Sequence, residues 1–121
     1  MRMIVLALAA VFFGGMGLYA LIAPALLARP FQFRVAGAVS RSEIRAVYGG
    51  FGVAMAAVLG WSAVGDGPQH SGTALTVGVA LAGMAAGRVV SRLCDAPTGF
   101  YPIWFYCLVE VIGAGAVLAV A

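Results

Sequence analysis

The sequence predicts an all-α integral membrane protein, a four-helix bundle that forms a single domain over residues 1–121. Of the 121 residues, 64% are hydrophobic and only 9% are charged, whereas a soluble domain carries about 25% charged residues. The apolar residues form four runs at about 3–23, 45–64, 73–93 and 101–121. Each run is close to the ~20 residues that a helix needs to cross a bilayer. There is no period-two alternation, and open sheets do not span lipid, so we expect no strands.

Turn-forming residues separate the four predicted spans. Pro24 and Pro30 follow the first run, and the segment 29–43 forms the longest connection. Gly65-Asp-Gly-Pro68 separates the second run from the third, and Asp95-Ala-Pro-Thr-Gly99 separates the third from the fourth. Glycine and proline in these combinations are strong turn signals, so the chain is expected to reverse direction at each of them.

The positions of the arginines predict the orientation of the bundle. All seven basic residues are arginines, and six of them lie in or beside the first and third connections: Arg29, Arg34, Arg41, Arg45, Arg88 and Arg92. Only Arg2 lies on the other side. The positive-inside rule places the arginine-bearing connections in the cytoplasm and both termini outside it. The arginines border apolar runs and form no dense basic patch, which argues against a nucleic-acid partner.

Glu110 is the residue that points most directly to a functional site. It lies inside the fourth apolar run, where a charged side chain costs about 2.5–3.5 kcal/mol on insertion scales. Such a side chain is expected to face protein, a cavity or a cation rather than lipid. Arg45 and Arg88, each inside or at the edge of its own apolar run, are the candidate cations.

Polar residues recur at three- and four-residue steps, which places them on one face of each predicted helix. At about 1.5 Å per residue, Arg88 lies about 8 Å and Glu110 about 14 Å from the cytoplasmic ends of their helices. This arrangement predicts a pocket that opens toward the cytoplasm. The candidate catalytic residues are Glu110 and Asp95, and the candidate substrate-binding residues are Arg45, Tyr48, Arg88 and Tyr106.

Two carboxyl groups in unequal environments are typical of general acid–base catalysis. The pocket is therefore expected to bind a lipophilic small molecule that enters from the bilayer, and an isomerisation or cyclisation of that molecule is a candidate reaction. The chain carries no metal-ligand spacing and no phosphate-binding glycine loop, so we expect no metal and no cofactor. Cys94 and Cys107 form no CxxC motif, and whether they pair stays open.

Plainer interpretations of the same residues stay open. Arg45 could reach lipid phosphates, and Asp95 could cap the turn before Pro97. Glycines at Gly49-Gly50 and at Gly83 and Gly87 could let helices approach closely. The protein could then be a structural or accessory subunit of a larger membrane complex, or a homo-oligomer. A third alternative is a small proton-coupled transporter that uses Glu110.

Short motifs from the second run onward resemble a known family. These motifs are Arg45-Ala-Val-Tyr48-Gly49-Gly50, Ala86-Gly87-Arg88, Asp95 and Glu110. They are similar to the pattern of small bacterial four-helix membrane proteins classed as domain of unknown function 4345, over nearly the whole chain. The resemblance implies a multi-pass protein of the bacterial inner membrane and brings no assigned activity. Compact scaffolds of this kind include membrane isomerases and terpenoid cyclases, an analogy of fold alone.

Overall fold

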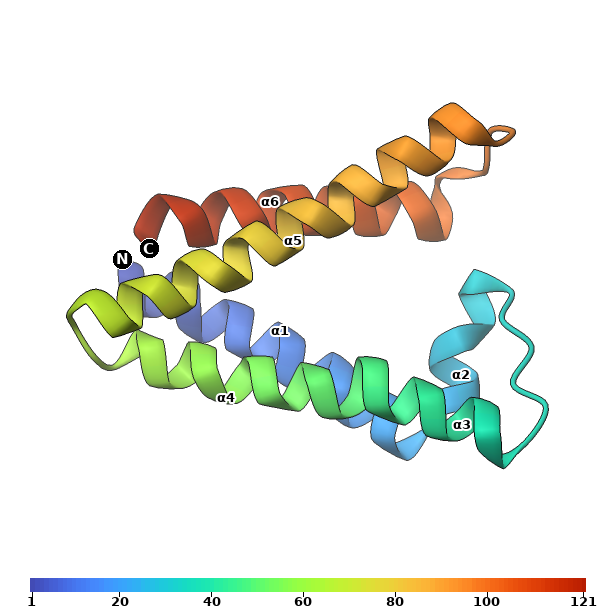
Figure 1. Ribbon diagram of the computed structural model, residues 1–121, viewed down its shortest axis with the longest axis horizontal. Helices are drawn as coiled ribbons and strands as arrows, with labels where there is room; N and C mark the ends of the chain where they lie inside the picture. The colour runs from blue at the N-terminus through green and yellow to red at the C-terminus, as the bar shows by residue number, and fades with distance from the viewer.

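Four long helices dominate the computed structural model, which describes residues 1–121 (Figure 1). In chain order the elements are α1 (Arg2–Ile22), α2 (Pro24–Ala28), η1 (Arg29–Phe31), α3 (Ala38–Ile44), η2 (Arg45–Gly50), α4 (Phe51–Ala63), α5 (Pro68–Cys94), η3 (Phe100–Trp104) and α6 (Phe105–Val120). Because η2 is a π-helical turn that continues into α4, Ala38–Ala63 forms one long rod. The segment η3 leads into α6, but it is interrupted at Tyr101, whose φ of −96° and ψ of 136° are not helical. The predicted all-α four-helix membrane fold is confirmed.

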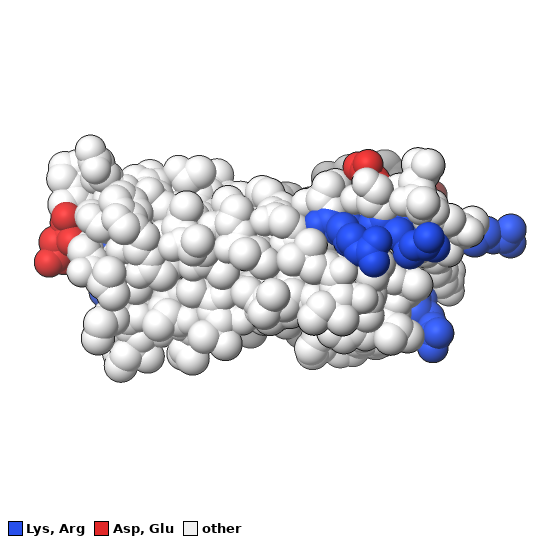
Figure 2. Space-filling view, turned by 90° about the horizontal axis from the view of Figure 1, so that it is seen from below, with Lys and Arg blue, Asp and Glu red and all other residues white.

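The surface of the molecule is that of a protein immersed in lipid. Only 21 of the 121 residues are buried, and many large apolar side chains on all four long helices are exposed. A soluble monomer rarely exposes apolar patches of more than a few hundred square ångströms. On the face that Figure 2 shows, acidic side chains lie at one end and arginines extend inward from the other, and a wide band between them carries no charged side chain. The apolar middle therefore matches the hydrocarbon core of a bilayer.

The second and third long helices extend beyond the apolar runs of the sequence. The second begins at Ala38 and the third at Pro68. Pro68 occupies the first turn of α5, where its fixed φ suits a helix and its missing N–H is not needed. Gly67 precedes it with a φ of 108°, a conformation that favours glycine. The helix thus starts as soon as the turn permits, before the hydrophobic stretch itself.

All four long helices contribute to one core, and it lies in the half of the bundle near the two termini. Figure 1 shows the N- and C-termini close together at that end. The core consists of Leu6, Phe13, Leu59, Ala63, Ala74, Val77, Leu81, Ala114 and Val117. These side chains come from about the first halves of α1 and α5 and from the last halves of α4 and α6. The four helices are therefore packed together at one end of the bundle.

The opposite end of the bundle is more open. There α1 stays against the α3–η2–α4 rod, whereas the α5–α6 pair lies apart from it in Figure 1. The short helix α2 folds back beside α3, and a second, smaller core of Ala20, Ala28 and Ile44 joins α1, α2 and α3. The loop-bearing end therefore has space between its two pairs of helices.

Glycines hold α1 and α4 in close contact. A Cβ atom placed on Gly52 would lie 2.9 Å from the Cα of Gly17, and one on Gly17 would lie 2.7 Å from the backbone nitrogen of Val53. Only glycine permits backbones to approach this closely. Gly49 packs against Leu21 in the same seam. The close approach that Gly83 and Gly87 could have allowed does not occur, because a Cβ there would meet no atom within 4 Å.

Arg2 ties the first helix to the end of α4. Its Nη1 donates hydrogen bonds to the carbonyl oxygens of Ser62 (2.7 Å) and Gly65 (3.1 Å), and its Nη2 donates to Ser62 Oγ (3.2 Å). Ser62, fully buried, donates in turn to the carbonyl of His70 at 2.6 Å. A cation at the carbonyl end of a helix is favoured by the helix dipole, so Arg2 has a structural role at the terminal end.

The glycine seam gives the first testable prediction. Gly52→Ala should destabilise the protein by about 1–3 kcal/mol, the usual cost of forcing an extra methyl group into a packed core. Gly60→Ala is the matched control on the same helix, since a Cβ at Gly60 meets nothing within 4 Å. Unfolding in detergent, followed by helical circular dichroism during titration with sodium dodecyl sulfate, measures both variants. Equal stability of the two would contradict the close contact.

Candidate functional site

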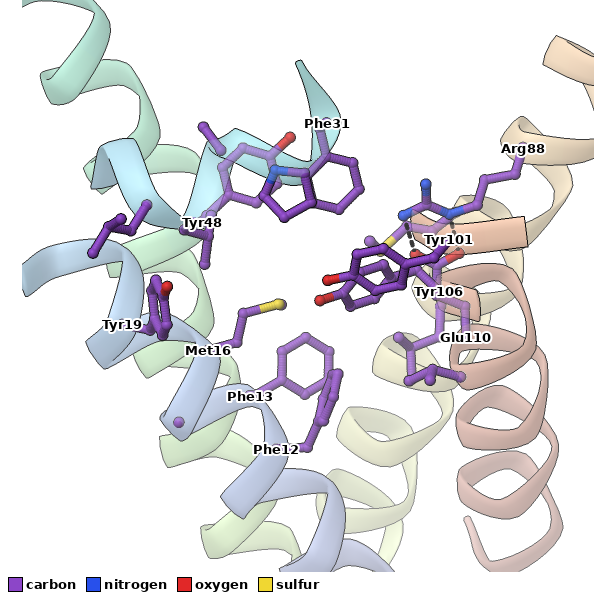
Figure 3. A pocket seen from close by; sticks show the side chains of 18 of the residues that line it. Phe12, Phe13, Met16, Tyr19, Phe31, Tyr48, Arg88, Tyr101, Tyr106 and Glu110 are labelled. Atoms are coloured by element: carbon purple, nitrogen blue, oxygen red, sulfur yellow. Dashed lines mark hydrogen bonds and ion pairs between the residues drawn. The ribbon is translucent and has the colours of Figure 1, made fainter. Parts of the chain in front are cut away.

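A cavity of about 500 Å³ lies in the open half of the bundle. We call it the inner cavity. It is lined by Val11, Phe12, Phe13, Gly15, Met16, Tyr19, Leu26, Leu27, Ala28, Pro30, Phe31, Phe33, Tyr48, Leu81, Met84, Arg88, Tyr101, Tyr106, Val109 and Glu110. Sixteen of these twenty residues are hydrophobic, so the cavity suits an apolar ligand. Figure 3 shows side chains of α1 on one side of it and those of α5 and α6 on the other.

The charged groups of the inner cavity are Arg88 and Glu110, and they form one ion pair. Arg88 Nε donates to Glu110 Oε2 at 2.8 Å, and Arg88 Nη2 donates to Glu110 Oε1 at 2.7 Å. Two parallel hydrogen bonds of this kind are the strongest arrangement of a guanidinium and a carboxylate. Glu110 is only 5% exposed. The intramembrane carboxylate therefore faces a cation, as the sequence predicts, and its partner is Arg88.

Arg88 keeps one nitrogen directed away from this pair. Nη1 makes none of the hydrogen bonds to Glu110, and in Figure 3 the third guanidinium nitrogen points away from the carboxylate. The guanidinium carbon lies 5.9 Å from the centre of the Tyr106 ring, within the range of a cation–π contact. Arg88 is thus fixed by Glu110 and Tyr106 with one donor group left to face another molecule.

Aromatic rings form the wall of the inner cavity near the ion pair. The rings of Phe31 and Tyr106 lie 5.4 Å apart, and those of Phe31 and Phe33 lie 6.1 Å apart. Such separations are typical of favourable aromatic contacts. Phe31 belongs to η1, so the folded-back segment α2–η1 reaches across the cavity to α6. This contact covers the cavity at the loop-bearing end.

Two irregular segments of the helices each place a tyrosine in the cavity wall. Tyr48 lies in the π-helical turn η2, whereas Tyr101 lies at the non-helical break within η3. π-Helical turns are rare and are frequent at functional sites, because an extra residue in a turn redirects the side chains around it. Tyr48 and Tyr106, both predicted as binding residues, line the inner cavity together with Arg88 and Glu110.

Arg45 does not reach the inner cavity. Its Nε donates a hydrogen bond of 3.0 Å to the carbonyl oxygen of Leu21, in the last turn of α1. Basic side chains near a helix C-terminus satisfy its free carbonyl groups and interact favourably with its dipole. The structure therefore places Arg45 as a cap on α1, and the expected meeting of Arg45 with Glu110 does not occur.

Asp95 lines a different cavity from Glu110. This outer cavity, of about 480 Å³, lies at the end of α5 and the start of η3 and is bounded by Met84, Gly87, Arg88, Ser91, Arg92, Asp95, Ala96, Thr98, Ile103 and Trp104. Asp95 is exposed, and it makes no ion pair with either arginine of this cavity. The two predicted acids are thus separated, and the expected Glu110–Asp95 acid–base pair is not assembled in one cavity.

The contribution of α1 and η1 to the site was not predicted from the sequence. Phe12, Met16 and Tyr19 lie on the cavity side of α1, and Phe31 follows the Arg29-Pro30 break. An apolar side chain on an apolar helix gives no signal in the sequence that separates a cavity wall from a lipid contact. The aromatic Phe31 after a proline was the one local feature that could have indicated a covering segment.

The two cysteines of the chain do not pair with each other in the structure. Cys94 is exposed and Cys107 is buried, and both are free. Cys107 Sγ lies 3.9 Å from the carbonyl oxygen of Ala85, so it packs between α5 and α6 as a small apolar side chain. No group of three or more His, Cys, Asp or Glu side chains is placed to hold a metal ion.

Comparison with known proteins places the chain in a family. The family described as "Domain of unknown function (DUF4345)" matches residues 1–121. The chain belongs to this family. No curated protein and no solved structure matches the chain. The suspected resemblance is therefore confirmed over the whole length, and the function of this DUF4345 protein has to be argued from its own site.

The Arg88–Glu110 pair gives the second prediction. Arg88→Met should cost about 3 kcal/mol of stability, because it leaves a buried carboxylate without its partner. Glu110→Met should cost less, since the Arg88 side chain is 20% exposed and the Glu110 side chain only 6%. The double variant should recover about 2 kcal/mol relative to the sum of the single variants.

The same detergent unfolding measurement on the four proteins gives this coupling energy. Simple additivity of the two single substitutions would show that the pair does not form in the folded protein.

Proposed function

We propose that this DUF4345 protein binds a lipophilic small molecule within the bilayer and recognises one polar group on it. The observation that carries the proposal is the composition of the inner cavity: an apolar lining with a single, closed ion pair, Arg88–Glu110. Ligand sites in proteins combine a mostly apolar wall with a few placed polar groups in the same way. The volume of about 500 Å³ falls within the range of about 300–1,000 Å³ usual for such sites.

The polar groups of the cavity favour a ligand with a hydrogen-bonding or anionic end. Arg88 offers the nitrogen that Glu110 does not use, and the nearby tyrosines Tyr48, Tyr101 and Tyr106 bring hydroxyl groups to the lining. In a low-dielectric site each of these donors contributes more than in water. The aromatic and aliphatic wall would hold the apolar body of the ligand.

The geometry supports binding more directly than acid–base catalysis. Both oxygens of Glu110 already accept hydrogen bonds from Arg88, and Asp95 lies in the outer cavity. A general base has to be within hydrogen-bonding reach of the proton that it takes up. Isomerisation or cyclisation would therefore need Glu110 to exchange Arg88 for the substrate, so we propose ligand binding as the function of this site.

We also propose that the loop-bearing end faces the cytoplasm. Arg29, Arg34 and Arg41 lie in the first connection and the following α3, and Arg92 lies in the last turn of α5. This asymmetry supports an orientation with both termini outside the cytoplasm. In a bacterial inner membrane the mouth of the site would then be reached from the cytoplasmic side.

Filling the inner cavity tests the proposal and forms the third prediction. Gly15 lines the cavity, and a Cβ there meets nothing within 4 Å, so Gly15→Leu should occupy ligand space without disturbing the helices. Gly115→Leu is the matched control, because Gly115 is also helical and open but does not line the cavity. The proteins are purified in mild detergent, and organic extracts are compared by mass spectrometry.

A lipophile should co-purify with the wild type and with Gly115→Leu, and its amount should fall about tenfold in Gly15→Leu, equivalent to about 1.4 kcal/mol of binding free energy. Equal lipophile content in all three proteins would overturn the proposal. A stoichiometric protein partner with no bound lipophile would support the accessory-subunit alternative in its place.

A further inference from the structure

The outer cavity is chemically different from the inner one. Its volume of about 480 Å³ is similar, but only four of its ten lining residues are hydrophobic. It lies where α5 ends and the chain turns into η3, at the arginine-rich end of the molecule. It therefore lies at the depth of lipid headgroups in a helix bundle that spans a bilayer.

The two cavities meet at Arg88. Met84 and Arg88 line both of them, so the Arg88 side chain forms part of the wall between the apolar space and the polar space. Its Nε and Nη2 are held by Glu110, and Nη1 points away from that carboxylate (Figure 3). A ligand that occupied both cavities would pass directly beside this guanidinium.

The outer cavity carries a second arginine with no carboxylate partner. Arg92 follows Arg88 by four residues on α5, which places both on the same face of the helix. The Arg88–Glu110 contact is the only ion pair in the structure, so neither Arg92 nor Asp95 is neutralised by a partner. Because Glu110 neutralises Arg88, the charges of Arg92 and Asp95 leave no net charge here, so an anionic group would be held by the hydrogen-bond donors of Arg92 and of Arg88 Nη1 rather than by an excess of positive charge.

We propose that the outer cavity binds the anionic head, a phosphate or carboxylate, of an amphiphile whose apolar chain occupies the inner cavity. This inference rests on the proposed function and specifies its ligand class. Arg92 and the free nitrogen of Arg88 supply charge-assisted hydrogen bonds to the anion, and the hydroxyl groups of Ser91 and Thr98 lie in the same lining. Arg88 recognises the point where head and chain join.

An anion held in the outer cavity differs from an ordinary contact between an interfacial arginine and bulk lipid. Arginines at helix ends commonly reach lipid phosphates, and such contacts do not require a cavity. Binding of a lipid head within the outer cavity, in contrast, requires that no side chain fill this space. Gly87 lines the outer cavity, and a Cβ there meets nothing within 4 Å, so Gly87→Leu would fill the cavity while leaving both arginines in place. Gly83, also open and on the same helix, lines neither cavity.

The fourth prediction uses three amphiphiles with the same chain: hexadecyl phosphate, hexadecylphosphocholine and hexadecanol. Each is titrated against the purified full-length protein and followed by native mass spectrometry. The wild type should bind hexadecyl phosphate about tenfold more tightly than hexadecanol, a difference of about 1.4 kcal/mol. Arg92→Gln and Gly87→Leu should each remove most of this preference, chiefly by weakening the binding of hexadecyl phosphate. Gly83→Leu should behave as the wild type does.

Other outcomes would overturn the inference in distinguishable ways. Equal binding of hexadecyl phosphate and hexadecylphosphocholine would show that the site does not select an anionic head. If inorganic phosphate displaced hexadecyl phosphate and left hexadecanol bound, the outer cavity would hold a free anion rather than a lipid head. Hexadecanol could bind to the inner cavity, as shown by a loss of binding in Gly15→Leu, while hexadecyl phosphate bound no more tightly than hexadecanol. In that case only this inference would fail. If none of the amphiphiles bound, the proposed function would fail with it.

Discussion

The carboxylate of Glu110 is the constraint on which the site depends. A charge inside an apolar helix cannot face lipid without a large cost, so α6 must turn this residue toward α5, where Arg88 meets it through two hydrogen bonds. This contact fixes the rotation of both helices about their axes. Since Cys107 packs against the carbonyl of Ala85 one turn away, the two helices lie in close contact beside the pair.

The rest of the architecture follows from an uneven distribution of packing. Small residues allow α1 to pack closely against α4, with the backbones of Gly17 and Gly52 in contact. The nine-residue core joins all four long helices near the termini. At the other end the side chains of α5 and α6 meet each other but do not fill the space toward α1. A cavity therefore forms beside the ion pair, and the segment α2–η1 covers it with Phe31.

Much of the fold could be predicted because it depends on local quantities. Four apolar runs of membrane-spanning length, the turns between them and the inward position of Glu110 follow from composition, spacing and the cost of a buried charge. Tyr48, Arg88 and Tyr106 could be assigned to the same pocket as Glu110 because their spacing along each helix and their depth in the bilayer point to one interior space. Arg45 and Asp95 met the same criteria, yet Arg45 caps α1 and Asp95 lines the outer cavity.

The sequence by itself determined that this chain spans a membrane as four helices and that its intramembrane carboxylate needs a cation. Both conclusions rest on the free energy of transferring each segment into lipid, which depends on the segment alone. Only the tertiary structure decided that the cation is Arg88, that α1 and η1 complete the cavity, and that a second cavity adjoins it. These features depend on how far apart the helices lie. That separation is set by contacts such as Gly17 with Gly52, whose partners are 35 positions apart in the chain.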